Sequence, residues 1–566
     1  MAEGRRAVQG VGALAVTKEP RPRIPPNVAS IRFDLIIIGA GINGAGIARD
    51  AALRGLRVLL LDKDDIGGAT SAWNTRLIHG GLRYLEYAEI SLVRESLRER
   101  KTLLRIAPHL VRPLQLMVPI YRRSTRGPWT IRAGMFLYDL LSAGAAIGRH
   151  RMLPPEEAAA LAPGLGRQGL LGAALYHDAQ VEFAERLVLE NALDAAFRGA
   201  VVITHAPATR IVVENGAAAG VEFTDRLTGT SHSARAPVVI NAAGPWADDL
   251  LGTLGATAPE RMVGGTRGSH IVVGPFSGAP RVALYSEART DARPYFIVPW
   301  NGQYLIGTTD IRHDADPGEA RAGGAEIDYL LSETNSLIPS ARLGRGDILL
   351  TYSGVRPLPY EPDKRPADVT RRHIIHDHGA DPSPIRGLLS VIGGKLTTYR
   401  SLAEEVVTRV FALLGRDDPG CTTAAIPLPG ARANPLDRYC REFRHEFALP
   451  PEVCERLLRI YGSRAGLIGQ LVERNPSLGA RLPGATPVLA AEVVHAIKQE
   501  HAATLTDVLA RRMLLALSPD RGLPALAPAA AVAQEIWPRE KVEEDAREYE
   551  RFVRETTGVP GPPTPP

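Results

Sequence analysis

The sequence predicts an α/β fold in which a Rossmann-like unit is followed by a strand-rich region and an all-helical C-terminal part. A strand, a glycine-rich turn, a helix and a second strand follow one another from Asp34 to Asp62, which is typical of a βαβ unit in a parallel sheet. Short strand patterns separated by Gly, Pro and Asn turns dominate residues 261–360. From about residue 425 onward only helical patterns remain.

The composition is that of an ordinary globular protein. Of the 566 residues, 45% are hydrophobic, 23% charged and 5% aromatic, which excludes a mostly disordered or fibrous chain. The length predicts two or three domains. The formal net charge of +5 is too small to indicate a nucleic-acid partner, and we expect none. No apolar run reaches the ~18–20 residues of a membrane-spanning helix.

We expect four regions along the chain: a disordered extension (1–33), the main α/β part (34–425), a helical domain (426–545) and a Pro-rich tail (546–566). Arg5 and Arg6 precede a short apolar patch, so a twin-arginine export signal stays one alternative for the N-terminus. The three cysteines, Cys421, Cys440 and Cys454, form no redox motif and are interpreted as structural thiols.

The segment Gly39-x-Gly41-x-x-Gly44 carries the strongest functional signal. Gly39 allows a tight turn, Gly41 lets the backbone approach a pyrophosphate, and Gly44 permits close packing of helix on strand. The helix N-terminus then offers N–H groups to phosphates. Asp62 ends the second strand, where its carboxylate can accept hydrogen bonds from ribose hydroxyls. These features predict a dinucleotide site.

Further elements follow in order. Residues 88–107 are predicted to form an amphipathic helix, whose basic residues lie on a solvated face paired with Glu95 and Glu99. Residues 120–141 join a basic turn to an apolar helix, and residues 181–240 combine a helix with short strands. In the C-terminal part, Thr504-x-x-Asp507 forms a capping-box-like helix start, with Asp in place of Glu.

Three more glycine-rich segments follow the first: residues 67–86, NAAGPWAD (241–248) and GGKLTT (393–398). Segments so far apart indicate that the chain wraps a long cofactor, such as FAD, from several sides.

Several motifs together carry a family resemblance: DLIIIGAGINGAGIARDAALRG, SAWNTRLIHGGLRYLE, NAAGPWAD, GSHIVV, YLIGTTD, SGVRPL and SVIGGKLTTYR, in this order. The chain resembles the FAD-dependent glycerol-3-phosphate dehydrogenases, which belong to the D-amino-acid-oxidase-like flavoenzymes. EVVHAIKQEHAATLTDVLARRMLL is similar to that family's helical cap domain. The resemblance covers about residues 34–520.

The resemblance implies a Rossmann-like FAD-binding domain interleaved with an antiparallel-sheet substrate domain, and a C-terminal all-helical cap domain. The implied reaction converts sn-glycerol 3-phosphate to dihydroxyacetone phosphate, and the electrons pass to a membrane quinone. We expect FAD, bound with or without a covalent link at His79, and no metal ion. The expected FAD contacts are Gly39, Gly41, Ile42, Asn43, Gly44, Asp62, Lys63, Thr70, Ser71, Thr75, Leu77, His79, Gly80, Gly81, Ala243, Gly244, Trp246, Gly394, Lys395, Leu396 and Thr397.

A phosphorylated substrate needs a fixed cationic pocket. The family pattern supplies Arg83 with Tyr84, Arg356, Arg371 and Lys395; Arg372 competes with Arg371 for its role.

Loss of the hydroxyl proton needs an acceptor, and histidine suits this role. We expect His270 to be catalytic and to contact the substrate, together with Arg356; His79 is the second candidate for the base.

A quinone acceptor requires attachment to one side of a membrane. Residues 121–138 combine Arg122, Arg123 and Arg126 with Trp129 and Phe136, which fits an interfacial helix, although Met135 and Tyr138 could equally pack in the core. We therefore expect a cytoplasmic protein attached peripherally to the inner face of the plasma membrane, with a homodimer as one open option.

Three other functions stay open: a glycerol-3-phosphate oxidase that uses O2, a related amine or amino-acid oxidase, and a non-catalytic flavoprotein sensor. The amine or amino-acid oxidase would need one carboxylate-binding arginine and no cluster of cations.

Overall fold

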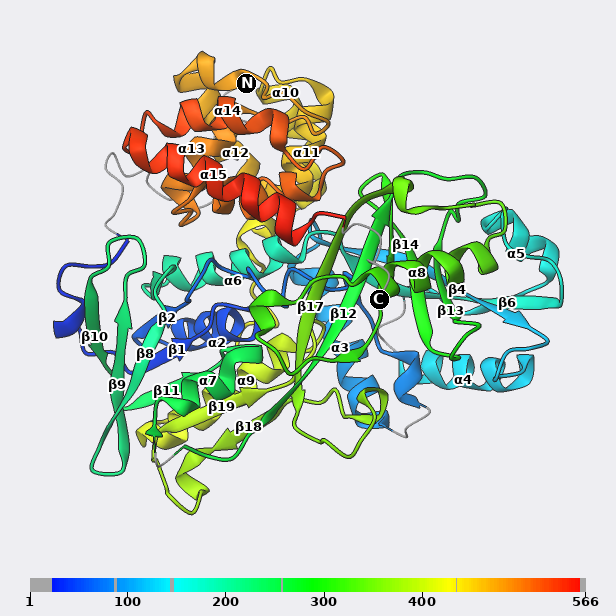
Figure 1. Ribbon diagram of the computed structural model, residues 1–566. Coiled ribbons are helices and arrows are strands. Elements are labelled where there is room, and N and C mark those ends of the chain that lie inside the picture. The colour runs from blue at the N-terminus through cyan, green and yellow to red at the C-terminus, as the bar shows by residue number, and fades with distance from the viewer. Residues whose placement is uncertain (1–22, 86–88, 143–146, 256–257, 434, 560–566) are drawn as a thin grey trace, which may run out of the picture.

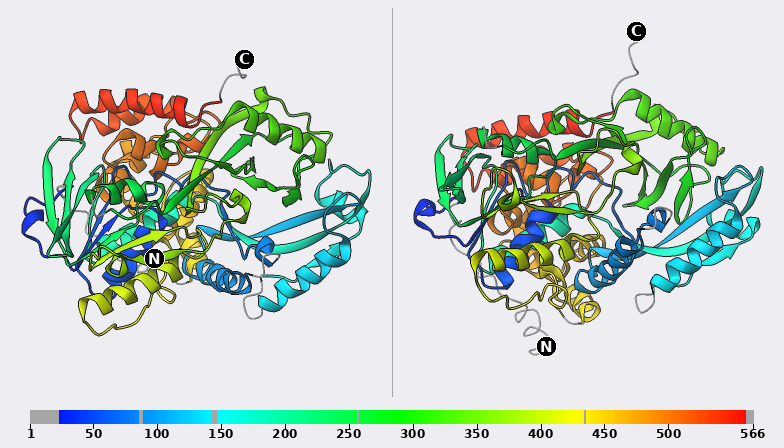
Figure 2. Two further views of the ribbon diagram at one scale, coloured as in Figure 1. Left: turned by 60° about the horizontal axis from the view of Figure 1, so that its bottom comes forward. Right: turned by 90° about the horizontal axis from the view of Figure 1, so that it is seen from below.

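The computed structural model describes residues 23–85, 89–142, 147–255, 258–433 and 435–559. Two sheets and a cluster of C-terminal helices make up most of this part, and the helices lie on one side of the sheets (Figure 1). Figure 2 shows the same three bodies in two further views, of which the right-hand one is from below.

The first sheet has six strands in the order β18-β19-β11-β1-β2-β7, all parallel except the edge strand β18. All four residues of β1 are buried, because both faces of this sheet are covered. One face packs on α2, α6 and α9, and the other on the small antiparallel sheet β8–β10. The bounds are β1 Leu35–Ile38, β2 Val58–Leu61, β7 Val201–Ile203, β8 Ala208–Glu214, β9 Ala217–Thr224, β10 Ser231–Arg235, β11 Val238–Asn241, β18 Ile374–Asp377, β19 Leu388–Ile392, α2 Ile42–Leu53, α6 Ala184–Phe197 and α9 Tyr399–Leu414.

The second sheet is large, and all its pairs are antiparallel except β13 with β4. Its strands come from two insertions between strands of the first sheet, so the two sheets are interleaved in the sequence, as the family resemblance implies. Its strands are β3 Leu77–Ile78, β4 Val111–Tyr121, β5 Arg151–Leu153, β6 Leu170–Val181, β12 Val263–Val273, β13 Ala283–Glu287, β14 Pro294–Trp300, β15 Gln303–Gly307, β16 Ile311–Arg312 and β17 Ile348–Pro359. Nearby helices are α3 Ile90–Ile106, α4 Pro128–Leu141, α5 Pro155–Leu161, α7 Ala247–Gly252 and α8 Gly324–Leu337.

The C-terminal part is helical, and in the described residues no further strand follows β19. Its helices are α10 Leu436–Glu446, α11 Pro451–Tyr461, α12 Ala465–Arg474, α13 Ala490–Gln499, α14 Leu523–Ala533 and α15 Arg539–Thr556. The capping pair is present: Asp507 N–H donates to Thr504 Oγ1 at 3.1 Å, and Thr504 N–H donates to Asp507 Oδ2 at 3.0 Å. The helix that follows has π geometry over Asp507–Arg512. The boundary at 425/426 stays a prediction.

Two terminal boundaries differ from the expectation. Residues 1–22 lie outside the described residues, but Val28 and Phe33 of the expected extension are buried beside the small sheet. The expected tail begins too early, since α15 continues to Thr556 and buries Tyr549 and Val553 among the C-terminal helices. Amphipathic spacing in α15, rather than the Pro content beyond it, decides where the fold ends.

The helix predicted at 88–107 is present as α3, but part of its charge is buried rather than solvated. Arg100 pairs with Asp178 of β6, and Glu99 accepts from Arg400 of α9 at 2.6 and 2.7 Å. The expected pairing within one exposed helix face is therefore wrong for Arg100. Glu99 keeps such a partner, since Arg98 lies 3.5 Å from its carboxylate, but Glu99 is buried and also binds Arg400.

Candidate functional site

A cavity of about 590 Å³ opens at the carboxyl ends of the parallel strands. Its wall takes Gly39 from the turn after β1, Asp62 from the end of β2, Ala242 from the end of β11 and Gly393 from the end of β19. Ligands of open α/β sheets bind at this edge, where consecutive βα loops diverge. The fold thus brings together the glycine-rich segments that the sequence analysis singled out.

Two glycines of the first turn, Gly39 and Gly44, fill positions with no room for a side chain. Gly39 has φ +106°, and a Cβ there would lie 2.4 Å from the carbonyl oxygen of Ala242. A Cβ on Gly44 would lie 1.8 Å from the carbonyl oxygen of Gly39, so the helix can approach the strand only with glycine at this position. Gly41 is the N-cap of α2 and lines the cavity. The amide of Ile42 donates to Ser71 Oγ at 2.9 Å. This amide is therefore already bonded, and what the N-terminus of α2 offers an anionic ligand is its place on the cavity wall and its positive partial charge.

Two backbone amides hold the carboxylate of Asp62 in place. Its carboxylate accepts from the amide of Ala40 at 2.6 Å and from that of Asp64 at 2.8 Å. Burial raises the pKa of Asp62 to about 6 despite these bonds. Next to it, Lys63 Nζ lies 3.6 Å from the ring centroid of Trp246, and both residues line the cavity.

These walls fit FAD. The glycine turn and α2 suit a pyrophosphate, and Asp62 suits a ribose. The side-chain oxygen of Asn43, on the cavity wall, is buried without a hydrogen-bond partner, so it is available to a ligand. Most of the expected FAD contacts line the cavity; among them are Gly39, Gly41, Ile42, Asn43, Asp62, Lys63, Thr70, Ser71, Thr75, Leu77, His79, Ala243, Gly244, Trp246, Gly394, Lys395, Leu396 and Thr397.

Three expected contacts do not line the cavity: Gly44, Gly80 and Gly81. Gly44 acts through packing, and Gly80 donates its amide to Tyr138 at 3.0 Å. Gly81 has φ +79°, and a Cβ there would meet the Tyr84 ring. These glycines shape the segment behind the wall rather than the wall itself.

An anion pocket is built around one buried carboxylate, Asp310. Its oxygens contact Arg356 at 3.0 Å, Arg293 at 3.1 Å and Arg371 at 3.2 Å. Burial would raise the pKa of Asp310, but the three guanidinium groups outweigh burial and lower it. Arg356 also donates to Thr308 Oγ1 at 3.0 Å, and burial lowers its pKa to about 10. Three positive charges against one negative charge leave this cluster with a net charge of plus two, and of its four members Arg356 and Arg371 line the cavity.

Lys395 adds a further cation to the same cavity. Its ammonium donates to Ser96 Oγ of α3 at 3.0 Å and lies 4.0 Å from the ring centroid of Tyr84. Burial lowers the pKa of Lys395 to about 7. Tyr84, Arg356, Arg371 and Lys395 all line the cavity, so the structure brings these expected substrate residues together. The backbone of Arg83 lies in the short helix Leu82–Leu85, but its side chain lies outside the described part.

The two candidate histidines occupy different places. His79 lines the cavity, and burial lowers its pKa to about 3. His270, on β12, is not among the lining residues; its Nε2 lies 3.0 Å from Thr75 Oγ1, and Thr75 does line the cavity. Burial lowers the pKa of His270 well below its usual range, and its Nδ1 has no partner. His270 therefore meets the cavity only through the Thr75 hydroxyl.

Sequence reasoning missed Asp310 and Arg293. Asp310 closes the motif YLIGTTD, which was noted for its resemblance, but a single acid at a strand end gave no signal of three arginine partners. Arg293 lies just before β14 and belongs to none of the quoted motifs.

The apolar helix predicted at 120–141 is present as α4 and has two faces. Met135 and Tyr138 are buried, whereas Trp129, Phe136 and Leu140 are 79%, 67% and 61% exposed. Among the described residues, no helix combines the length and the apolar character that crossing a bilayer requires.

Comparisons with known proteins agree with this geometry. Residues 34–400 match the FAD dependent oxidoreductase family, and residues 421–541 match the C-terminal domain of alpha-glycerophosphate oxidase. Glycerol-3-phosphate dehydrogenase of Synechocystis sp. is 46% identical over 94% of this chain and 98% of its own length. D-erythritol 1-phosphate dehydrogenase of Brucella abortus is 37% identical over 85% of this chain and 93% of its own.

A solved structure is similar throughout. The glycerol-3-phosphate dehydrogenase of Bacillus halodurans, complexed with FAD, is 28% identical with a TM-score of 0.74, over 94% of this chain and 96% of that one. The chain belongs to the FAD-dependent oxidoreductase family and, within it, to the glycerol-3-phosphate dehydrogenases. Its cofactor is FAD.

Proposed function

We propose that this chain oxidises sn-glycerol 3-phosphate to dihydroxyacetone phosphate and that the electrons pass from FAD to a membrane quinone. The observation that carries the proposal is the cluster of Arg356, Arg371 and Lys395 in the wall of the cavity that the glycine turn opens into. A phosphate carries about two negative charges and matches this excess of positive charge. An amino-acid substrate would need one arginine for its carboxylate, not this group.

The residues divide the work by their chemistry. Arg356 and Arg371 bind the phosphate, since planar guanidinium groups suit its oxygens. Bound FAD supplies the hydride acceptor for the carbon that carries the reacting hydroxyl. Lys395, with its ammonium on the cavity wall, stabilises negative charge that develops during the reaction.

The hydroxyl proton leaves towards Thr75 and His270. Thr75 lines the cavity and its Oγ1 is bonded to Nε2 of His270, so Thr75 can donate its own hydroxyl proton to that nitrogen as it accepts the proton of the substrate hydroxyl. The lowered pKa keeps His270 neutral, so it has a free nitrogen to accept a proton, but it also makes His270 a weaker base than an unperturbed histidine. His79 stays the second candidate, because it lines the cavity directly.

The test follows the flavin absorbance near about 450 nm, a property of the cofactor, in the absence of oxygen. We expect sn-glycerol 3-phosphate to bleach it faster than D-erythritol 1-phosphate, glycerol or an amino acid does. Faster bleaching by D-erythritol 1-phosphate would change the assigned substrate, and bleaching by an amino acid alone would reject the proposal. Reoxidation by a ubiquinone analogue without peroxide supports quinone; rapid peroxide formation in air supports the oxidase.

We also propose that the protein attaches to the inner face of the plasma membrane through α4. Trp129, Phe136 and Leu140 are spaced seven and four residues apart, so they share one face of the helix. Arg122 and Arg123 are exposed in the turn before it and would meet anionic headgroups, at about 1 kcal/mol per basic residue. Large exposed apolar side chains beside basic ones are typical of interfacial helices.

Co-sedimentation with anionic vesicles tests this attachment. Wild type should bind, and Trp129→Ser with Phe136→Ser should bind clearly less, with the same flavin content. The matched control is Phe197→Ser, which removes an exposed aromatic residue from a different helix. Equal binding of all three proteins to the vesicles would show that the exposed face of α4 does not attach the protein to the membrane.

A further inference from the structure

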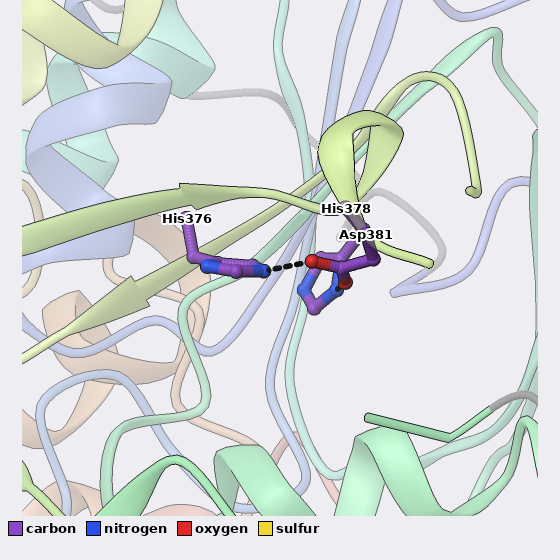
Figure 3. Close-up of side chains that lie close together, drawn as sticks. All are labelled: His376, His378 and Asp381. Carbon is purple, nitrogen blue, oxygen red and sulfur yellow. Dashed lines mark hydrogen bonds and ion pairs between the residues drawn. The ribbon is translucent and has the colours of Figure 1, made fainter. Parts of the chain in front are cut away.

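Three side chains of metal-ligating type meet at the turn between β18 and β19, away from the cavity (Figure 3). His376 lies on β18, His378 begins the short helix His378–Ala380, and Asp381 follows it. Figure 3 shows the Asp381 carboxylate beside the two imidazole rings, facing both. None of these residues has a role in the proposed reaction.

The donor atoms are close enough for a shared ion. His376 Nε2 lies 2.7 Å from one carboxylate oxygen of Asp381, and His378 Nδ1 lies 2.8 Å from the other. All the ligand atoms lie within 4.8 Å of one another. Metal–ligand distances of about 2.0–2.2 Å in a tetrahedral site separate the ligands by roughly 3.3 Å. The two His–Asp contacts would therefore open by about half an ångström, while any donor atoms that are up to 4.8 Å apart would move closer together.

The surroundings of His378 suit a ligand. Its Nε2 lies 2.8 Å from the hydroxyl of Ser390 on β19, and metal-bound histidines usually have such a partner on the second ring nitrogen. A serine hydroxyl can donate or accept. It can therefore hold the ring either with Nδ1–H bonded to Asp381 or with Nδ1 bound to a metal. The His376 side chain is one-third exposed, which gives an ion a path from solvent.

We propose that His376, His378 and Asp381 bind one divalent first-row transition-metal ion, with water completing its coordination. Two imidazoles and one carboxylate suit zinc or a related ion better than magnesium or calcium, which prefer oxygen ligands only. The ion fastens the turn between β18 and β19, the strands that lie between Arg371 and the loop Gly393–Lys395. The sequence analysis expected no metal ion. The spacing of His376, His378 and Asp381 is not one that is specific to metal sites, so the sequence alone gave no signal for this ion.

Metal titration of the untagged holoenzyme, after treatment with a chelator, tests the proposal. Calorimetry with Zn²⁺ should find one more equivalent in wild type than in the double variant His376→Ala, Asp381→Asn. Co²⁺ should give visible d–d absorption in wild type that the variant lacks. The melting temperature of wild type should rise with Zn²⁺ concentration, since the ion binds only the folded turn.

The matched control is His373→Gln, which removes a nearby histidine that pairs with Glu405 and not with the cluster. It should bind metal as wild type does. Two results would overturn the proposal: the same number of bound Zn²⁺ equivalents in wild type and the double variant, or no d–d absorption from Co²⁺ in wild type. The cluster would then be two His–Asp hydrogen bonds and no metal site. If the double variant fails to fold, His376→Ala alone and the wild-type Co²⁺ spectrum still decide.

Discussion

Asp310→Asn tests whether one carboxylate organises the anion pocket. Asp310 holds Arg356, Arg293 and Arg371 at 3.0–3.2 Å. The substitution keeps the size of the side chain but removes its charge, so the net charge of this group rises from two to three. Two opposite effects follow. More positive charge attracts a phosphate more strongly, whereas guanidinium groups without their shared partner repel one another and lose their positions.

The two effects act on different kinetic constants. Stronger electrostatic attraction of the phosphate tightens binding and lowers KM. Displacement of the guanidinium groups weakens contacts in the transition state and lowers kcat. A charge-assisted hydrogen bond that Arg356 no longer makes correctly is worth about 1.5–3 kcal/mol. At about 1.4 kcal/mol per factor of ten, kcat should fall roughly ten- to 150-fold, with KM no higher than that of wild type and flavin content intact.

Steady-state kinetics with sn-glycerol 3-phosphate, with inorganic phosphate as competitor, measures both effects. The control is Asp328→Asn, which removes an exposed carboxylate of α8 that pairs with Arg345 and should change neither constant. An Asp310→Asn enzyme with normal kcat and a lower KM would refute the positioning argument and leave Asp310 as a charge that merely weakens binding.

Three further predictions follow from the same contacts. Gly41→Val should abolish flavin content, because its Cβ would lie 3.2 Å from Ser71 Oγ and its branches would fill the space for the pyrophosphate; full flavin in the purified variant contradicts this. Arg356→Ala should lower kcat/KM for sn-glycerol 3-phosphate about ten-fold or more with flavin retained, and an unchanged ratio removes Arg356 from the pocket. Burial lowers the pKa of His205, but Asp507 at 2.8 Å outweighs burial, so the pKa of His205 in the folded protein is raised. The stability that this pair adds is therefore fully present below the unfolded pKa of about 6.5. It is lost as the pH rises through the pKa of the folded protein. The melting temperature of wild type should exceed that of His205→Asn by a margin that shrinks with rising pH, and a constant margin would contradict the pairing.

The cofactor wall could be predicted from sequence because its signals are local. Each signal marks the place where a strand ends in a turn: the glycines of the first turn, the acid at the end of β2, and the segments after β11 and β19. Parallel strands bring such ends to one edge of the sheet whatever their distance in sequence. Knowledge of the strand ends therefore sufficed to place Asp62 and Gly394 in one cavity.

The carboxylates that position cations could not be found in this way. Asp310 and Arg356 are 46 residues apart, and Arg100 reaches Asp178 across 78 residues. Helical spacing paired Glu99 with neighbours on its own helix, and the structure keeps Arg98 as one partner but adds Arg400 on α9, which the spacing could not show. A charge pattern along one helix reports which residues share a face, not whether that face meets water or another element.

α4 shows how both interpretations of one segment can hold at once. The apolar and basic residues at 121–138 suggested either an interfacial helix or core packing. In the structure, Tyr138 turns inward and donates to Asp178 at 2.8 Å, which fixes the helix on β6, while Trp129 and Phe136 point away from the core. A helix held rigidly from beneath loses little further conformational freedom when its outer face enters a membrane. The buried face of α4 therefore supports the proposed membrane contact rather than competing with it.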